Sequence, residues 1–313
     1  MLRFSRHTTG QLNSSWYNGT MQVYPGYQGD AMCYFVNGVH GNDGNNGLSW
    51  ERPFATIQAA LNVARYLPGT AVIDDTKDHH SFVFVAPGHY NEQILFSGYN
   101  IHLIGCGCWP GKDYGVSINY DGAVGAPCAL GFSGSGLEMA NLHISIATAF
   151  PGILVTGGDN NWIHDCTIEC DGTNATYGMH MQSMKGSIIE DCIIERPTLR
   201  GIRVDDEGDA DCYFIDGAIR RNQIHGDTAG VIGINVDPNN VCYNAVIDSN
   251  WIDVAGGGAT SLAIRNEAAA NVMITRNMMV VGAGATPATS AGIGMLHNCA
   301  SVNGVVTVEF DDD

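Results

Sequence analysis

Carboxylate side chains gather in one short segment of this sequence, directly after Arg203. The segment reads Asp205-Asp206-Glu207-Gly208-Asp209-Ala210-Asp211. Closely spaced carboxylates suit two kinds of chemistry, because they can bind Ca²⁺ or act as the acid and base that cleave a glycosidic bond. The candidate catalytic or Ca²⁺-binding residues are therefore Asp205, Asp206, Asp209 and Asp211. The alternative is an acidic surface loop without chemistry, since the segment lies in the longest gap between the repeats described below.

Cysteines and histidines are the other side chains that could bind a metal or act in catalysis. The chain has ten cysteines and eleven histidines. The pair Cys106-Gly-Cys108 lacks zinc-knuckle spacing, and the histidines are scattered over different repeats. We expect free, buried thiols that behave as small apolar side chains. Apart from Ca²⁺ at the acidic segment, the sequence predicts no metal or cofactor.

One pattern recurs from residue 137 onward. It consists of an aliphatic residue, two further residues, Asn or Cys, one more residue and a second aliphatic, as in Ile189–Ile194 and Ile247–Ile252. The Asn or Cys positions are Asn141, Cys166, Cys192, Asn222, Asn250 and Asn277. We expect each to lie at the bend after a strand, in the left-handed backbone that Asn tolerates. Stacked in a column, these side chains would form a hydrogen-bonded ladder.

A second series has the same period and pairs a small residue with an aliphatic one. Its members are Gly152-Ile153, Gly178-Met179, Gly201-Ile202, Gly233-Ile234, Ala263-Ile264 and Gly292-Ile293. The runs around them alternate apolar and polar residues, which indicates short strands. One such unit cannot bury its own apolar face, but stacked coils can. The sequence therefore predicts an all-β fold, a single-stranded parallel β-helix.

The N-terminal third contains one helical pattern. Apolar residues at helical spacing predict a helix over residues 54–67, with Pro53 before it and Pro68-Gly69 at its end. This short helix would cap the open end of the solenoid. Strands are expected at 82–85, 93–96 and 101–104. The predicted organisation is an arm or strap at 1–32, a loop and capping helix at 33–80, and the β-helix with a short acidic tail at 81–313.

The charge balance excludes some partners. The net charge is −18, so the surface repels phosphate backbones and we expect no nucleic acid partner. The sequence has no run of about 20 apolar residues, the length that a membrane helix needs. Arg3 and Arg6 are not followed by an apolar run, so we also expect no signal peptide.

Several N-terminal motifs carry a family resemblance. A Gly-, Asn- and Asp-rich loop at 36–47 precedes Pro53-Phe-Ala-Thr-Ile-Gln-Ala-Ala60, and Ala86-Pro-Gly-His-Tyr90 and Gly105-Cys-Gly107 follow. This order resembles the opening of pectate-lyase-like proteins, and the resemblance covers roughly residues 34–300. It implies a right-handed β-helix. Lyases, glycosidases, epimerases, phage tailspikes and inert virion proteins share that fold, and the polygalacturonase-like signatures are not present as such.

Three functional hypotheses follow. The first is a phage-type virion structural protein, a capsid decoration, head protrusion or spike, that assembles in the host cytoplasm as a homotrimer and is not an enzyme. Aromatic residues of the arm would contact capsid or other virion proteins: Trp16, Tyr17, Tyr24 and Tyr27. The second hypothesis is a polysaccharide lyase or glycoside hydrolase. The third is a carbohydrate-binding β-helix that recognises a surface glycan.

Overall fold

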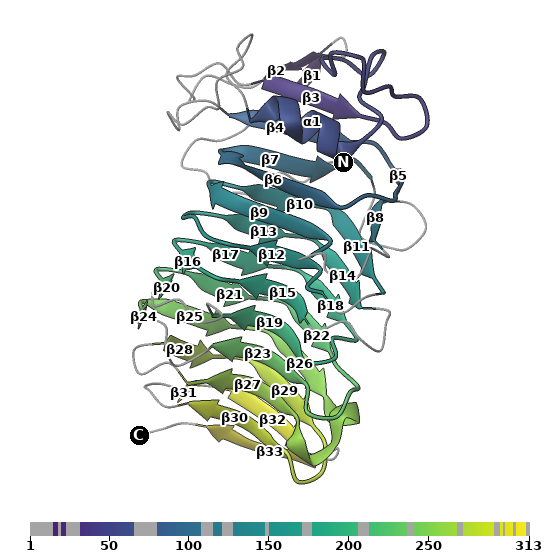
Figure 1. The fold of residues 1–313 in the computed structure, drawn as a ribbon. Coiled ribbons are helices and arrows are strands. Elements are labelled where there is room, and N and C mark those ends of the chain that lie inside the picture. The colour runs from purple at the N-terminus through teal and green to yellow at the C-terminus, as the bar shows by residue number, and fades with distance from the viewer. Residues whose placement is uncertain are drawn as a thin grey trace.

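The chain forms a parallel β-helix in which successive rungs stack from α1 at one end to β33 at the other (Figure 1). The computed structural model describes residues 15–17, 20–22, 32–65, 80–107, 115–120, 128–147, 150–170, 177–205, 213–236, 241–267, 272–290, 295–296, 298–302 and 305–310. Three long sheets run along the solenoid, and a typical rung contributes one strand to each. Stacking lets every rung bury its apolar side chains against the rungs before and after it.

Sheet 1 has ten strands: β3 (Met32–Val36), β4 (Ser81–Val85), β7 (Ile101–Gly105), β10 (Glu138–Ala140), β13 (Trp162–His164), β17 (Ile188–Glu190), β21 (Ala218–Arg220), β25 (Ala245–Asp248), β28 (Val272–Thr275) and β31 (Met295–Leu296). Sheet 2 has ten: β5 (Gly88–Tyr90), β8 (Val116–Tyr120), β11 (Leu142–Ile146), β14 (Thr167–Cys170), β18 (Ile193–Glu195), β22 (Gln223–His225), β26 (Trp251–Val254), β29 (Met278–Val281), β32 (Asn298–Val302) and the antiparallel β33 (Val305–Phe310).

Sheet 3 has eight strands: β6 (Ile94–Tyr99), β9 (Leu130–Ser135), β12 (Ile153–Val155), β15 (Tyr177–Met181), β19 (Arg200–Val204), β23 (Ile232–Val236), β27 (Leu262–Asn266) and β30 (Thr286–Ser290). A three-stranded side sheet contains β16 (Met184–Lys185), β20 (Tyr213–Ile215) and β24 (Val241–Tyr243). The remaining elements are the hairpin β1 (Ser15–Tyr17) and β2 (Thr20–Gln22), the helix α1 (Ile57–Ala64) and the 3₁₀ segment η1 (Ala255–Thr260). The prediction of a parallel β-helix is confirmed.

The interior is a set of stacked aliphatic columns. In sheet 1, for example, Ile163, Ile189, Ile219, Ile247 and Ile274 occupy the same register position on five successive rungs. All five are fully buried. Since each column repeats one side-chain type, neighbouring rungs pack in the same way. The outward positions of the strands are thereby left free to vary, and chemistry has to be sought there.

The predicted Asn/Cys ladder exists, but its first step was misplaced by one residue. Asn222, Asn250 and Asn277 each accept, at the side-chain Oδ1, the backbone N–H of the ladder residue on the preceding rung, at 3.0 Å. Asn298, which the sequence analysis missed, extends the ladder by one step. The register aligns Leu142, not Asn141, with Cys166.

The expected left-handed backbone also belongs to a different residue. Asn141 has φ 56°, and the equivalent residue of each later rung has positive φ too, among them Asp165, Asp191, Arg221 and Arg276. The ladder residues that follow them are not in that conformation. The bend therefore uses two residues: the first makes the left-handed turn, and the second points inward and carries the ladder.

The small-residue column is explained by close backbone contact. A Cβ added at Gly233 would lie 2.3 Å from Cγ2 of Ile252 and 2.6 Å from the carbonyl oxygen of Ala263. Gly152, Gly178 and Gly201 have equivalent neighbours. The sixth member was wrong: Ile264 pairs with Ala288, whereas Gly292-Ile293 lies outside the described residues.

The helix α1 is shorter than predicted and begins after Thr56, whose side chain caps it by accepting the N–H of Ala59. Phe54 is not helical because its backbone pairs with Phe35 and Asn37 in a β-bridge-like arrangement. Pro68-Gly69 lies outside the described residues. Gln58 of the helix bonds both the N–H and the carbonyl oxygen of Leu95 in β6, so α1 covers the end of sheet 3.

Three further predictions can be compared with the structure. β3 pairs with β4, so the solenoid begins before residue 81. The eight described cysteines are free. Among the described residues, no helix is long and apolar enough to cross a membrane.

Candidate functional site

The outward face of sheet 3 carries a group of ionisable and polar side chains on consecutive rungs. The strands β15, β19, β23 and β27 lie on four consecutive rungs. Their register places His180, Arg203, Asn235 and Arg265 in one row along the solenoid axis. Tyr177 and Arg200 form the start of a second row on the same face. Neighbours in these rows are 23–32 positions apart in the sequence, and only the stacking of rungs brings them together.

Asp205 lies at the centre of a hydrogen-bonded group of side chains on this face. One carboxylate oxygen lies 2.8 Å from Nε2 of His180, and the other accepts hydrogen bonds from the Arg203 guanidinium. Both the Asp205 and the His180 side chains are only 4% exposed. Arg203 also donates to the hydroxyl oxygen of Tyr177 and lies over its ring, 4.8 Å from the centroid. Asp205 thus holds His180 and Arg203 in fixed positions.

The electrostatics of Asp205 follow from these contacts. Burial alone would raise the pKa of its carboxyl group, but the hydrogen bond from His180 and the charge of Arg203 outweigh burial, and the pKa is lowered. A carboxylate that stays ionised and has both oxygens occupied is a poor general acid. Its geometry is that of a residue that positions its neighbours.

Arg200 and Arg265 bring further positive charge to the same face. Among the described residues, the only hydrogen bond from the Arg200 side chain goes to the backbone oxygen of Leu199, at 2.8 Å, and no carboxylate pairs with it. Burial, followed by the repulsion of Arg265, lowers the pKa of Arg200. Arg265 is paired with Glu267. Between Arg203 and Arg265, the buried Asn235 has an Oδ1 atom without a hydrogen-bond partner.

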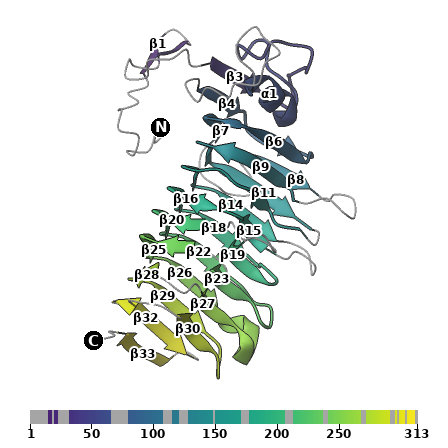
Figure 2. The ribbon, with the colours of Figure 1, turned by 60° about the vertical axis from the view of Figure 1, so that its left-hand side comes forward.

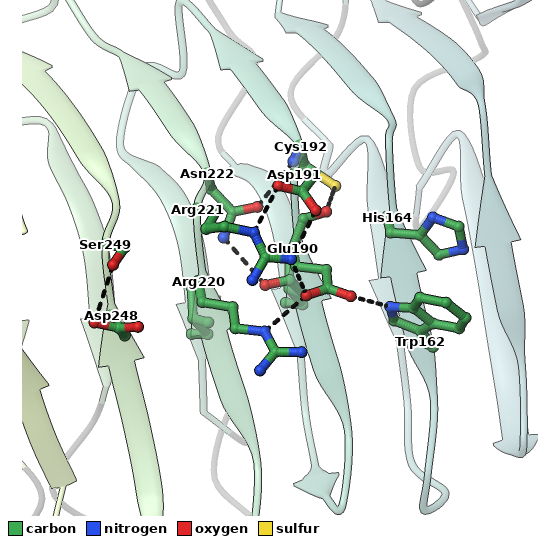
Figure 3. A network of polar contacts seen from close by, with 12 residues as sticks. Trp162, His164, Glu190, Asp191, Cys192, Arg220, Arg221, Asn222, Asp248 and Ser249 are labelled. Atoms are coloured by element: carbon green, nitrogen blue, oxygen red, sulfur yellow. Dashed lines mark hydrogen bonds and ion pairs between the residues drawn. The ribbon is translucent and has the colours of Figure 1, made fainter. Parts of the chain in front are cut away.

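Sheet 1 carries a second polar network on its outward face, and there the charges are matched (Figure 3). Glu190 accepts hydrogen bonds from Nε1 of Trp162, at 2.9 Å, and from Nε of Arg220, at 2.7 Å. Arg221 donates to both oxygens of Asp191, at 2.9 and 2.8 Å. Burial opposes the ionisation of Glu190, but the arginines lower its pKa. Because cation and carboxylate alternate from rung to rung, this network stabilises the stacking and leaves no charge for a ligand.

The same face continues toward the N-terminal end as a chain of imidazoles. Glu138 lies between His102, at 2.6 Å, and His164, at 3.2 Å. His164 contacts Asp165 through its other ring nitrogen, at 2.8 Å. The described residues include no group of three His, Cys, Asp or Glu side chains that could hold a metal ion. His102 and His164 are buried, and Glu138 joins them across neighbouring rungs.

The structure describes only some of the predicted site residues. Asp205 lies in the candidate site, although in a positioning role, while Asp206, Asp209 and Asp211 lie outside the described residues, so the Ca²⁺ prediction there is untested. Trp16 and Tyr17 belong to β1, whose side chains are not described, and Tyr24 and Tyr27 lie outside the described residues. Cys166 and Cys192 are ladder residues. Each thiol contacts two backbone carbonyl oxygens, at 3.3 and 3.8 Å.

Sequence reasoning missed the residues that surround Asp205. His180, Arg200, Asn235 and Arg265 each look like an ordinary outward residue of an alternating strand. Except for Arg200, the signal that could have found them was the Gly-aliphatic series, because the second residue after each of its glycines or the alanine lies outward and falls in a common row. On the four rungs these residues are His180, Arg203, Asn235 and Arg265, which follow one another at intervals of 23, 32 and 30 residues.

Comparison with known proteins agrees with this fold. The family model described as "Right handed beta helix region" matches residues 98–279. No curated protein matches the chain. Among solved structures, pectin methylesterase PemA from Erwinia chrysanthemi superposes with a TM-score of 0.51 at 13% identity, over 89% of this chain and 91% of that one. A pectin methylesterase in complex with a hexasaccharide gives a TM-score of 0.50 at 13% identity, with the same coverage.

At this level of identity the solved structures show a shared fold alone. The family match covers more than half of the chain, and it agrees with the rung order seen in the structure. The chain belongs to the right-handed β-helix family.

Proposed function

We propose that this protein binds an acidic polysaccharide along the outward face of sheet 3 and cleaves it by β-elimination. The observation that carries the proposal is the group of three arginines on that face. Arg200 and Arg203 lie on β19, and Arg265 lies on β27 two rungs further along, in a chain whose net charge is −18. A cluster of cations that survives in so acidic a protein fits an anionic ligand, and guanidinium groups match the geometry of carboxylates.

Arg200 is the best candidate for holding a sugar carboxylate. Arg203 is bound to Asp205, and Arg265 is bound to Glu267. Arg200 makes no ion pair within the part of the chain that the structure describes. Its guanidinium group is partly buried, so a salt bridge to a ligand would form in a less polar environment than water and would be stronger there.

Elimination fits the described residues better than hydrolysis. Hydrolysis of a glycosidic bond needs two carboxyl groups, one of them protonated. Asp205 remains ionised, with both oxygens occupied, and Glu267 is paired with Arg265. In an elimination, binding of the uronate carboxylate by Arg200 would make the neighbouring C–H more acidic. A base would then take that proton while the bond to the glycosidic oxygen breaks and a C=C bond forms.

Tyr177 is the side chain that we assign to proton transfer. It aligns with Arg200 on the next rung, and its oxygen accepts a hydrogen bond from Arg203, which would stabilise a phenolate. In the proposed reaction the phenolate takes the proton from carbon, and the resulting hydroxyl returns a proton to the leaving sugar oxygen. No water is consumed, and the product is an unsaturated uronate.

The test uses polyuronates with and without carboxyl methylation. We expect Arg200→Ala to weaken binding of the acidic polymer at least tenfold, and Tyr177→Phe to retain binding but abolish formation of the unsaturated product, followed by its ultraviolet absorbance. Arg276→Ala serves as the control, because it removes an exposed arginine that pairs with Asp248 of sheet 1. Equal binding by the wild type and Arg200→Ala, or full turnover by Tyr177→Phe, would exclude the assignment.

A virion role is a second, separate proposal. It is supported by the sequence alone, through the aromatic residues interleaved in 1–32. In that case the polysaccharide would be a surface glycan of the host, and the protein would be a trimer attached to the particle by its arm. Mass spectrometry of purified particles checks this proposal, and absence of the chain from them would refute it.

A further inference from the structure

The outward face of sheet 2 carries an exposed aromatic side chain among polar residues. Trp251, at the start of β26, is 43% exposed. Its row contains Gln223 on the preceding rung, also exposed. The parallel row contains Glu195, His225 and Asp253 on three consecutive rungs, all partly exposed. Figure 2 shows the strands β18, β22 and β26 that carry these side chains one below the other.

The indole of Trp251 is held in place by a neighbour. Its ring meets the ring of His225 edge to face, with centroids 5.4 Å apart and planes at 76°. Such a contact limits rotation of the indole. A large, fixed and exposed aromatic surface contributes strongly to binding when a partner covers it, because it loses little conformational entropy in doing so.

The polar groups around Trp251 are hydrogen-bond acceptors that the described part of the protein leaves largely free. Neither Glu195 nor Asp253 forms an ion pair with a described residue, and the side chain of Asp253 accepts the backbone N–H of Ala255, at 3.1 Å. On the same sheet Arg196, the residue after Glu195, is paired with Glu169 of the preceding rung and with neither Glu195 nor Asp253. Two ionised carboxylates repel an anionic ligand and accept hydrogen bonds from hydroxyl groups.

We infer that Glu195, Gln223, His225, Trp251 and Asp253 form a second glycan-binding site, which takes an uncharged sugar chain. The apolar face of a sugar ring would lie on the indole, and its hydroxyl groups would donate to Glu195 and Asp253. Rungs repeat at about 4.8 Å, so two rungs separate these carboxylates by roughly 10 Å, and a sugar chain that lies across His225 would reach both of them. Gln223 offers both a donor and an acceptor beside it.

The size of the site favours a sugar over a protein. Three rungs and two rows of side chains cover on the order of 150 Å². A stable protein–protein interface needs about 800 Å² from each partner. The inference does not rest on the proposed function, because the two sites lie on different sheets and take ligands of different charge.

The test begins with an array of uncharged oligosaccharides built from glucose, galactose, mannose and xylose. The chain retained most strongly is then titrated calorimetrically into the wild-type protein and its variants. We expect Trp251→Ala to weaken binding at least tenfold, Trp251→Phe to weaken it less, and Glu195→Gln and Asp253→Asn to weaken it several-fold each. Arg200→Ala, in the sheet 3 site, is expected to bind the neutral sugar as the wild type does.

Met273→Ala is the matched control. Met273 lies on the outward face of sheet 1 and is 48% exposed, close to the value for Trp251, so its removal changes a similar amount of exposed apolar surface. The inference is overturned if the protein retains no oligosaccharide of the array, or if Trp251→Ala binds the sugar with wild-type affinity. The alternative ligand of this face is a second copy of the protein, and sedimentation velocity tests it. If Trp251→Ala reduces self-association, this face joins two copies and the glycan site is refuted. Both variants should unfold at the wild-type temperature, since the side chains removed are exposed.

Discussion

At the scale of single residues, the contacts of His164 on sheet 1 define the ionisation state of its ring. Both ring nitrogens of His164 face carboxylates, Glu138 at 3.2 Å and Asp165 at 2.8 Å. A ring that donates from both nitrogens is a cation. Burial opposes that charge, but the two carboxylates prevail and raise the pKa of His164 to about 9. Burial likewise opposes ionisation of Glu138, yet its bonds to His102 and His164 lower its pKa to about 2.

These pKa values predict how stability depends on pH. The raised pKa of His164 stabilises the fold fully below its ordinary value of 6.5, and this contribution disappears as the pH rises through 9. The lowered pKa of Glu138 stabilises the fold above 4.5, and this contribution is lost as the pH falls toward 2. We expect stability to be greatest near pH 4.5–6.5. His164→Gln should remove up to about 3 kcal/mol there.

The measurement is the urea midpoint of unfolding between pH 4 and 10. In His164→Gln, the decline between pH 6.5 and 9 should become shallower than in the wild type. His40→Gln is the control, because His40 is exposed in the loop before α1. An unchanged slope in His164→Gln would show that the imidazolium is not what stabilises this part of the sheet.

At the scale of elements, the bend between sheets 1 and 2 depends on the asparagine ladder. The side chain of Asn250 accepts the backbone N–H of Asn222 and donates to Oδ1 of Asn277 and to the carbonyl oxygen of Ile219. All of these groups are buried, so each would lose its partner without gaining water. One asparagine thus links its own rung to the rung before it and the rung after it.

We therefore expect Asn250→Ala to destabilise the protein by about 3–5 kcal/mol, because several buried polar groups lose their partners together. Chemical denaturation at a fixed pH measures this. Asn62→Ala, in the exposed part of α1, should change stability by less than about 0.5 kcal/mol. A loss below about 1 kcal/mol in Asn250→Ala would mean that the ladder follows from the stacking and does not stabilise it.

The glycine column makes a second prediction at this scale. In Gly233→Ala, the new Cβ would lie 2.3 Å from Cγ2 of Ile252, which is buried and cannot move away, and 2.6 Å from the backbone of the next rung. We expect a loss of about 2 kcal/mol or more. The control is Gly44→Ala, where the nearest atom is Oδ1 of Asn42 at 3.1 Å. Equal stability of the two variants would contradict close packing as the reason for the column.

The elements also show what sequence reasoning could reach. The inward residues repeat, so the periodicity of Asn222, Asn250 and Asn277 was enough to predict a β-helix and its ladder. Asn141 was misassigned because Asn suits both positions of the bend, the left-handed one and the inward one. The candidate site was missed for a different reason: outward residues do not repeat in type, so their row becomes visible only when the Gly-aliphatic series is used to align the rungs. Neither Arg200 nor Asn235 acquires meaning until the register of β19 and β23 is known.

At the scale of the whole molecule, charge works against the proposed ligand. The net charge of −18 repels a polyanion, while the arginines of sheet 3 attract it at short range. The two effects have different reach. At about 0.01 M salt the screening length is roughly 30 Å, and the ligand is affected by the charge of the entire solenoid. At about 0.15 M it is roughly 8 Å, and only charges near the site matter.

Affinity for a polyuronate should therefore pass through a maximum as salt increases. Between about 0.01 and 0.15 M, screening removes the long-range repulsion and binding should become tighter. Toward 1 M, where the screening length is roughly 3 Å, the attraction of Arg200 and Arg265 is screened as well and binding should weaken. Calorimetric titrations at several salt concentrations test this, with Arg200→Ala expected to show a smaller fall at high salt. If the affinity instead falls steadily from the lowest salt upward, the arginines of sheet 3 determine the electric field even at about 30 Å. In that case the acidic remainder of the solenoid does not hinder the approach of the ligand.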